Sequence, residues 1–342
     1  MTTKEQVEQA FSGVLVPGVG RSITQLNMVR EIEIINNIVK VTLAATALSP
    51  GSQDWIRTKT KAVMEKLPEV NKVEVEFILY KPTMLNRISH TIAVMSGKGG
   101  VGKSLVASLI AIALSRQGNE VGILDADITG PSIPKMFGIT THLGGSDTGI
   151  LPVLSRSGVE VISINLLLPM ESEAVIWRGP LISKAITQFW EDVVWGKLDY
   201  LIIDLPPGTA DVPLTVLQTL PISGVVIVFT PQDLTAMVVR KAVNMVQKMD
   251  KTILGVVENM SYLYIPEIDK RIELFGESKG EEMARVASAP FLGQLPIDPK
   301  LARLCDEGTI ENYNSDDFAA LSQAFVQALP KIKQRDLQQE LE

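Results

Sequence analysis

The stretch that decides the fold is 91-TIAVMSGKGGVGKS-104. Its first part, residues 91–96, is mostly apolar and predicts a buried strand. The strand runs into a glycine-rich turn, and a helix is predicted from about Lys103 onward. The turn fits the pattern G-x-x-x-x-G-K-[ST] at Gly97, Gly102, Lys103 and Ser104. A chance glycine turn would not be expected to fill every position of this pattern between a strand and a helix, so we interpret the stretch as a phosphate-binding loop.

The residue types in this loop explain why it can hold a phosphate chain. Glycines leave backbone N–H groups open to phosphate oxygens and accept positive φ angles. The helix start adds unpaired N–H donors and partial positive charge. We expect Lys103 to lie along the β- and γ-phosphates and the Ser104 hydroxyl to bind Mg²⁺. The predicted nucleotide-binding residues of the loop are Gly97, Lys98, Gly99, Gly100, Val101, Gly102, Lys103 and Ser104.

A second lysine, Lys98, directly follows the first glycine of the loop. The resulting GKGGVGKS resembles the deviant Walker A loop of the class that contains MinD, ParA and the nitrogenase iron protein. The resemblance implies that Lys98 crosses a nucleotide-sandwich homodimer to the partner's bound phosphates, where an added cation would assist catalysis. The alternative for Lys98 is a solvated loop lysine.

The composition limits the classes of protein to which the chain can belong. The chain has 342 residues, room for two domains, and 46% of them are hydrophobic, which is enough to fill a sizeable core. A single cysteine excludes an intrachain disulfide framework and fits a reducing cytoplasm. The start MTTKEQVEQAF lacks the apolar core of a signal peptide, no apolar run approaches the ~18–20 residues of a membrane span, and the net charge is −7. We therefore expect a cytoplasmic protein that binds neither membrane nor nucleic acid.

Residues 1–80 are predicted to form a small α+β domain. Apolar and charged residues alternate in EIEII and KVTL, on either side of Asn36-Asn37, which predicts a hairpin with a left-handed turn. A helix capped by Ser52 and a closing strand at residues 73–77 are expected to follow. This order resembles the MIP18-type (DUF59) domain of iron–sulfur protein maturation, although the cysteine that many relatives carry after the second strand is absent. Residues 81–90 are predicted to be a linker.

From Thr91 onward the pattern changes to strands that alternate with helices. Buried strands are expected at residues 120–124, 200–203, 224–229, 252–257 and 290–292. Such alternation predicts an α/β domain, residues 91–342, with a mostly parallel sheet and helices on both faces. Ligands of such sheets bind beyond the carboxyl ends of the strands, so we expect the site at that edge.

Three aspartates follow predicted strands. Asp204 ends YLIID as a Walker B aspartate does, and we place it in the outer shell of Mg²⁺, through water, on the side of Ser104. Asp125 and Asp127 lie in LDADITGPS, which resembles the switch I segment of the same class. The resemblance implies that Asp127 positions or deprotonates the attacking water and that Asp125 supports the Mg²⁺ shell. The alternative is structural, because aspartates at strand ends commonly cap the next helix.

The signals for the base favour ATP. The GTPase signature N-K-x-D is absent from the chain. Asn259, in VENMSY, matches the position at which relatives hydrogen-bond adenine. Pro296 and Asp298 lie in LPID, which resembles the loop that packs on the other side of the base. The alternative for Asn259 is an asparagine that only stabilises a turn.

The resemblance extends over nearly the whole chain. The segments MSGKGGVGKS, LDADITGPSIPKMFG, TPQDLTAMVVRKAV, VENMSY and LPIDPKLARLCDEG follow one another as they do in the Mrp/ApbC family of P-loop ATPases. The resemblance implies a cytoplasmic homodimer that binds ATP and Mg²⁺, hydrolyses ATP slowly, and carries or delivers iron–sulfur clusters to client or assembly proteins.

One departure from the family concerns the cluster. Relatives carry a C-x-x-C pair after NMSY, and two such pairs would supply four thiolates to a bridging [4Fe–4S] cluster. Here the corresponding residues are Ile265 and Ile268, and Cys305 is the only cysteine in the chain. We therefore expect an ATPase that serves iron–sulfur assembly without the usual cysteine-bridged cluster. Two alternatives remain: a ParA- or MinD-like positioning or regulatory switch, and a nucleotide-binding scaffold with negligible turnover.

Overall fold

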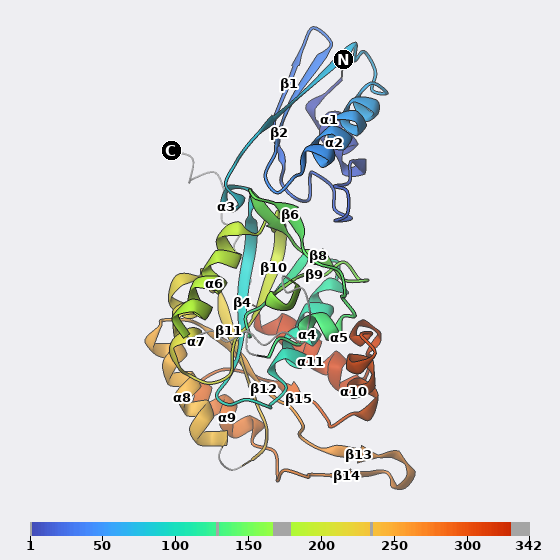
Figure 1. Ribbon diagram of the computed structural model, residues 1–342. Coiled ribbons are helices and arrows are strands. Elements are labelled where there is room, and N and C mark those ends of the chain that lie inside the picture. Colours follow the sequence, from blue (N-terminus) through green and yellow to red (C-terminus); the bar gives the residue numbers. More distant parts are fainter. Residues whose placement is uncertain (1, 128–129, 167–178, 233–234, 330–342) are drawn as a thin grey trace.

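The computed structural model describes residues 2–127, 130–166, 179–232 and 235–329. Figure 1 shows a small unit above a larger one, joined through α3 (Pro82–Leu85) and the start of β4 (Arg87–Ser96). Strand β4 begins at Arg87 rather than Thr91, because its first residues pair with β10 (Lys197–Asp204) in continuous register. A helix and the start of this strand therefore occupy most of residues 81–90, the segment expected to be a linker.

The small unit packs its helices against a three-stranded sheet of order β1-β2-β3. Its sheet confirms the predicted hairpin, with φ angles of 50° at Asn36 and 63° at Asn37 in the turn. The second helix begins at Pro50 with Ser49 as its N-cap, earlier than the expected cap Ser52. The elements are α1 (Lys4–Ala10), a 3₁₀ turn (Phe11–Gly13), β1 (Val29–Ile35), β2 (Ile38–Ala44), α2 (Pro50–Met64) and β3 (Lys72–Ile78).

The larger unit is built on an eight-stranded sheet of order β15-β12-β11-β4-β10-β5-β9-β8. All neighbouring strands are parallel except β8 and β9, which confirms the predicted mostly parallel sheet. The short strands β8, at the edge, and β9, next to it, were not predicted from the sequence. The further strands are β5 (Val121–Asp125), β8 (Val153–Leu154), β9 (Glu160–Ser163), β11 (Gly224–Phe229), β12 (Ile253–Glu258) and β15 (Phe291–Gln294).

Helices cover both faces of this sheet, as predicted. One face packs on α4 (Lys103–Ser115), α5 (Ile133–Met136), α10 (Pro299–Asp306) and α11 (Asp316–Ala328). The other packs on α6 (Gly179–Asp192), α7 (Asp211–Thr219), α8 (Thr235–Lys248) and α9 (Gly280–Ala287). Helix α4 is apolar nearly all round and is buried from Val106 to Leu114, so the phosphate loop leads into the core of the domain. In the described part of the chain, no helix has the length and apolarity that crossing a bilayer requires.

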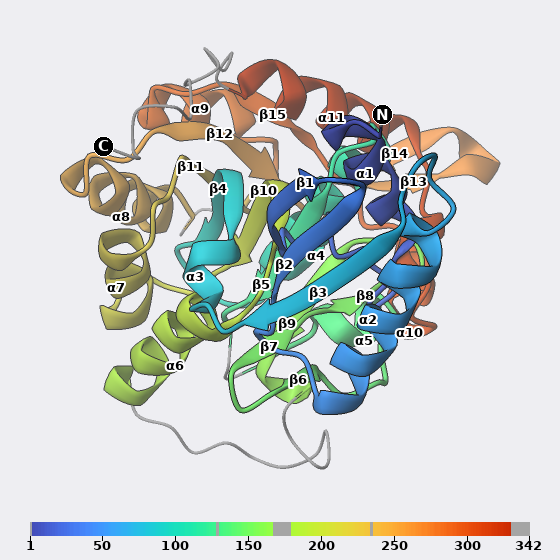
Figure 2. The ribbon, with the colours of Figure 1, turned by 90° about the horizontal axis from the view of Figure 1, so that it is seen from above.

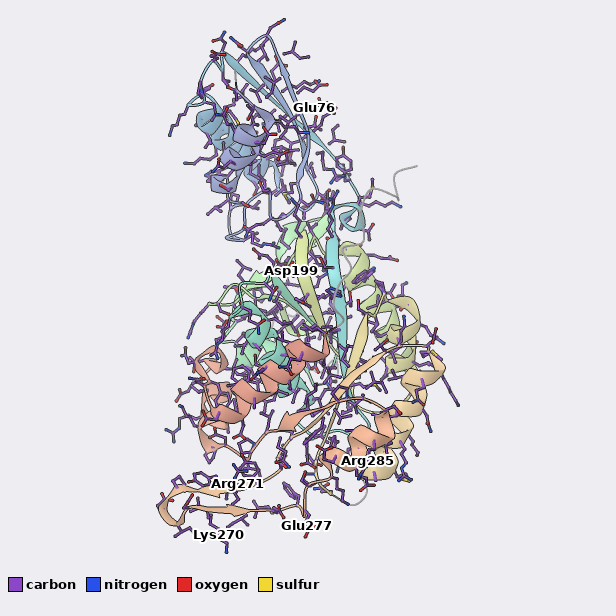
Figure 3. The ribbon with its side chains drawn as sticks, turned by 180° about the vertical axis from the view of Figure 1, so that it is seen from behind. Glu76, Asp199, Lys270, Arg271, Glu277 and Arg285 are labelled. Atoms are coloured by element: carbon purple, nitrogen blue, oxygen red, sulfur yellow. The ribbon has the colours of Figure 1, made fainter. Side chains whose placement is uncertain are left out.

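Two small hairpins complete the fold. One pairs β6 (Gly144–Ser146) with β7 (Gly149–Leu151), and the other pairs β13 (Leu263–Ile265) with β14 (Lys270–Ile272). The β13–β14 hairpin projects from the body below the sheet in Figure 1, and Figure 3 shows Lys270 and Arg271 on it. Further 3₁₀ turns lie at Ile164–Leu166, Pro266–Ile268 and Ile310–Asn312.

A buried ion pair joins the two units. The Arg21 guanidinium of the small unit contacts the Glu160 carboxylate of β9, and it donates to the Trp195 carbonyl at 3.0 Å. Next to this carbonyl, a Cβ at Gly196 (φ +64°) would lie 2.5 Å from the Gln25 carbonyl oxygen, so the close approach requires glycine. These contacts hold the small unit at the amino ends of β4 and β10, the side from which Figure 2 is seen. The carboxyl ends of the strands, which carry the site, face the opposite way.

Candidate functional site

The phosphate loop lies between β4 and α4, at the carboxyl edge of the sheet. Close contacts require glycine at two of its positions. A Cβ at Gly97 would lie 2.1 Å from Cγ1 of Val238, and one at Gly102 (φ +79°) would lie 2.1 Å from Nδ2 of Asn259. The loop borders a cavity of about 280 Å³, whose lining includes Gly99, Gly100, Lys103, Ser104, Asp127 and Pro207.

The three predicted aspartates come together at this loop. Strand β10 lies between β4 and β5, and its register pairs Asp204 with Asp125. The Lys103 ammonium lies 2.5 Å from Oδ1 of Asp204 and 3.7 Å from Oδ2 of Asp127. Asp125 and Asp204 are fully buried, and Lys103 is 6% exposed. Parallel strands that end at one edge thus bring together side chains that are far apart in the sequence.

Burial changes the protonation of the two innermost carboxyls. Desolvation, together with the negative charge of Asp204, raises the pKa of Asp125 from its ordinary 3.8 to about 8, although Lys103 opposes the shift. Desolvation also raises the pKa of Asp204, again against the charge of Lys103. Asp125 accepts hydrogen bonds from the Ser163 hydroxyl at 3.2 Å and from the Ile133 amide at 3.4 Å. Although Lys103 is a neighbouring cation, burial prevails. Both carboxyls therefore hold their protons up to a higher pH than exposed aspartates do.

The residues present fit a magnesium nucleotide. Two carboxyls, those of Asp204 and Asp127, share the Lys103 ammonium, and Oδ2 of Asp204 is buried without a hydrogen-bond partner among the described residues. A divalent cation with its water shell would offset this negative charge and give that oxygen a donor. Within the described ranges, no three His, Cys, Asp or Glu side chains are grouped to ligate a metal directly. The residues here that could hold a hydrated divalent cation are Ser104, at the start of α4, and the aspartates beside Lys103.

Asn259 lies beside the phosphate loop. Its Nδ2 donates to the Val101 carbonyl at 2.9 Å, and the residue is 1% exposed. Pro296 and Asp298 line a neighbouring cavity of about 880 Å³, and the Asp298 carboxylate caps α10 by accepting from the Lys300 amide at 2.8 Å. The structure thus places these three residues at the carboxyl ends of β12 and β15, and their contact with a base stays a prediction.

Lys98 contacts a side chain of its own subunit. Its ammonium donates to the side-chain oxygen of Gln232, which follows β11 in TPQDL. The Ser96 hydroxyl donates to the Lys98 carbonyl at 2.9 Å, which fixes the loop backbone. Sequence reasoning missed Gln232, and it also missed Glu258 at the end of β12. The available signal was similar for both: a polar residue at the end of a buried strand, or within three residues after it, at the edge where ligands bind.

Ile265 and Ile268, which stand where the resemblance predicts a cysteine pair, lie on the projecting β13–β14 hairpin. Ile265 ends β13, and Ile268, in the turn that follows, is 63% exposed. Cys305 lies elsewhere, half-buried in α10, where burial raises the pKa of its thiol to about 11. A thiol with this pKa is protonated near neutral pH, so neither place offers a ready thiolate ligand.

Comparisons with known proteins show which family the chain resembles. Residues 87–332 match the family described as NUBPL iron-transfer P-loop NTPase, and residues 4–77 match the family described as iron-sulfur cluster assembly protein. The iron-sulfur cluster carrier protein of Aquifex aeolicus is 37% identical over 319 residues, which cover 85% of this chain and 86% of the relative. That of Saccharolobus solfataricus is 46% identical over 226 residues, which cover 66% of this chain and 76% of the relative.

A solved structure extends the likeness to three dimensions. The nucleotide-binding protein of Archaeoglobus fulgidus, solved in complex with ADP, is 48% identical with a TM-score of 0.61. The match covers 68% of this chain and 91% of that one. Sequence, fold and loop geometry thus agree, and the chain belongs to the iron–sulfur cluster carrier family of Mrp/NUBPL-type P-loop NTPases, with an amino-terminal iron–sulfur cluster assembly domain.

Proposed function

We propose that the chain binds ATP with Mg²⁺ at its phosphate loop, hydrolyses ATP slowly, and uses this cycle in iron–sulfur cluster carriage or assembly. The observation that carries the proposal is the pairing of Lys103 with Asp204 and Asp127 beside the glycine loop, at a small cavity that Lys103 and Asp127 line. The relative that was solved with ADP supports an adenine nucleotide. In this proposal residues 91–342 are the ATPase domain, residues 81–90 connect it to the small domain, and residues 1–80 are that MIP18-like domain.

The loop residues would divide the phosphate chemistry among them. Backbone N–H groups and the Lys103 ammonium would bind phosphate oxygens, while Ser104, Asp125 and Asp204 would hold Mg²⁺, the two aspartates through water. When bound, Mg²⁺ offsets the phosphate charge during phosphoryl transfer. Asp127 is only partly buried, beside Lys103, and would orient the attacking water and accept its proton.

The base contacts favour adenine over guanine. The Asn259 amide nitrogen already donates to the Val101 carbonyl, and its other polar atom, Oδ1, is an acceptor. Such an acceptor suits the exocyclic amino group of adenine, whereas guanine carries a carbonyl oxygen at the same ring position. Pro296 and Asp298 would pack on the other side of the base.

We propose that the working form is a homodimer, in which Lys98 exchanges Gln232 for the partner's phosphates. Two copies of the chain hold two cysteines, both Cys305, and a bridging [4Fe–4S] cluster needs four thiolates. The chain would therefore act on client or assembly proteins that supply thiolates themselves, and it would not hold the usual cysteine-bridged cluster.

Calorimetric titration of the full-length protein with ATP, ADP and GTP, each with Mg²⁺, tests this function. We expect one adenine nucleotide per chain and GTP affinity weaker by about tenfold or more, because the base contact costs at least about 1.4 kcal/mol when mismatched. Phosphate release from ATP should be measurable and slow. A protein that takes up no adenine nucleotide would overturn the proposal.

A further inference from the structure

Glu258 is a buried carboxylate that belongs to neither the phosphate loop nor the aspartate group. It ends β12 and is fully buried. Four donors surround its two oxygens: the hydroxyls of Ser261 and Ser278 and the Gln294 amide bond to Oε2, and the Lys279 backbone amide bonds to Oε1 at 2.7 Å. Three of the donors share Oε2 and one bonds to Oε1, so both oxygens of the buried carboxylate are hydrogen-bonded.

Three of the donors come from the segments on either side of the projecting hairpin, and the fourth comes from β15, which pairs with β12. Ser261 lies two residues before β13, while Ser278 and Lys279 lie between β14 and α9. Gln294 is the last residue of β15, and Leu295 after it donates its amide to the Glu258 carbonyl at 2.8 Å. Glu258 therefore bonds to the segments on both sides of the hairpin, and it also bonds to the segment that leads from β15 to Pro296.

The other side of Glu258 adjoins the phosphate loop. Its neighbour Asn259 donates its side-chain amide to the Val101 carbonyl, and a Cβ on Gly102 would collide with that amide. The Asn259 backbone amide donates to the Phe229 carbonyl of β11 at 2.8 Å. The loop at Val101 and Gly102 is thus in direct contact with Asn259, the residue that follows Glu258 in the chain.

We propose that Glu258 is a positioning residue that couples the nucleotide site to the β13–β14 hairpin. This inference rests on the proposed function, because the phosphate loop must bind a nucleotide for the coupling to operate. The hairpin and the residues after it expose Tyr264, Ile268, Leu274 and Phe275. Their placement depends on where the two ends of the hairpin are held, so the nucleotide would control how this apolar surface is presented.

The experiment follows hydrogen exchange of the hairpin amides, residues 263–276, in the full-length protein with and without ADP and Mg²⁺. In the wild type we expect the nucleotide to slow this exchange at least about threefold. Glu258→Gln places an amide donor among existing donors, so we expect about tenfold faster hairpin exchange and no further response to the nucleotide. Calorimetry on the same samples shows whether the nucleotide is bound.

Two further variants keep the test informative if Glu258→Gln folds poorly. Ser278→Ala removes a single donor on the exit side of the hairpin, and it should reduce the nucleotide response while nucleotide affinity is kept. Glu277→Gln changes the exposed neighbour of Ser278, and it should behave as the wild type does.

The outcomes separate this inference from the function on which it rests. The coupling would be overturned if bound nucleotide left the hydrogen exchange of the wild-type hairpin unchanged. It would also be overturned if nucleotide slowed this exchange as much in both Glu258→Gln and Ser278→Ala as in the wild type. A wild-type protein that binds no nucleotide would overturn the proposed function instead, and would remove the ground for the coupling with it.

Discussion

The ammonium of Lys103 lies 2.5 Å from Oδ1 of Asp204, and both residues are almost completely excluded from water. Burying a carboxylate is costly unless a cation or several donors compensate it, and Lys103 is that cation. A triphosphate would compete with Asp204 for the same ammonium group. Nucleotide binding and the charge on the aspartates are therefore linked.

Lys103→Ala should abolish nucleotide binding and also destabilise the fold. Removing one partner of a buried ion pair costs about 3 kcal/mol or more, because the other charge stays buried alone. Calorimetry measures the binding, and urea unfolding measures the stability. Adding Asp204→Asn to this variant should restore much of the stability and none of the binding. Binding that survives in Lys103→Ala would contradict the assignment of the loop.

Asp127→Asn should leave nucleotide affinity nearly unchanged and lower ATP turnover by about 100-fold. The amide keeps the shape of the side chain but cannot accept a proton from water, and general bases typically contribute factors of about 10² to 10⁴. Single-turnover phosphate release on saturated protein isolates the chemical step. Turnover equal to that of the wild type would remove Asp127 from this role.

Lys98→Ala should bind ATP normally, yet lose nucleotide-dependent dimerisation and much of its turnover. The reason is that Lys98 of each subunit would contact the phosphates bound by the other subunit. Light scattering after gel filtration, with a non-hydrolysable ATP analogue, reports the dimer. Gln232→Ala, which removes only the contact within the subunit, should still dimerise. A Lys98→Ala protein with normal turnover and dimerisation would show that the lysine does not act across subunits.

The nucleotide-free protein should lose stability as pH rises from about 5 to about 8. Asp125 in the folded protein holds its proton up to about pH 8, whereas in the unfolded chain it releases the proton near its ordinary pKa of 3.8. The folded state thus binds more protons across this interval, so stability falls with rising pH, by at most about 1.4 kcal/mol per pH unit.

Urea unfolding at several pH values measures this slope, and Asp125→Asn should flatten it. The asparagine has the same size and carries no titrating proton, so the comparison isolates the carboxyl. A wild-type profile that is no steeper than that of Asp125→Asn would contradict the assignment.

Anaerobic incubation with iron and sulfide should produce no stoichiometric cluster on the wild-type protein. The double variant Ile265→Cys, Ile268→Cys would present four hairpin thiolates per dimer, and it should gain absorbance near ~400 nm at about one cluster per dimer. Cys305→Ser in the double variant should leave this yield unchanged. A wild-type protein that assembles a full cluster would show that other ligands hold it.

Much of the site could be predicted because its signals are local. The glycine spacing of residues 97–102 sets the shape of the loop. Polar residues at the ends of apolar strands mark the edge of the sheet where ligands bind. Asn36 and Asn37 specified their turn in the same way, because their side chains tolerate positive φ. Gln232 and Glu258 were missed although each stands at or near the end of a buried strand, because that position does not reveal their partners, which are distant in the sequence.

By itself, the sequence determined the phosphate loop, the α/β alternation and the absence of a cysteine pair, because each depends only on neighbouring residues. The tertiary structure alone decided that β10 lies between β4 and β5, which puts Asp204 beside Asp125 and under Lys103. It also decided that Arg21 is buried against Glu160. It decided, too, that the Glu258 carboxylate accepts hydrogen bonds from both sides of the β13–β14 hairpin. The physical reason is that strand order and burial are set by packing over the whole chain, and no local pattern specifies which elements will meet.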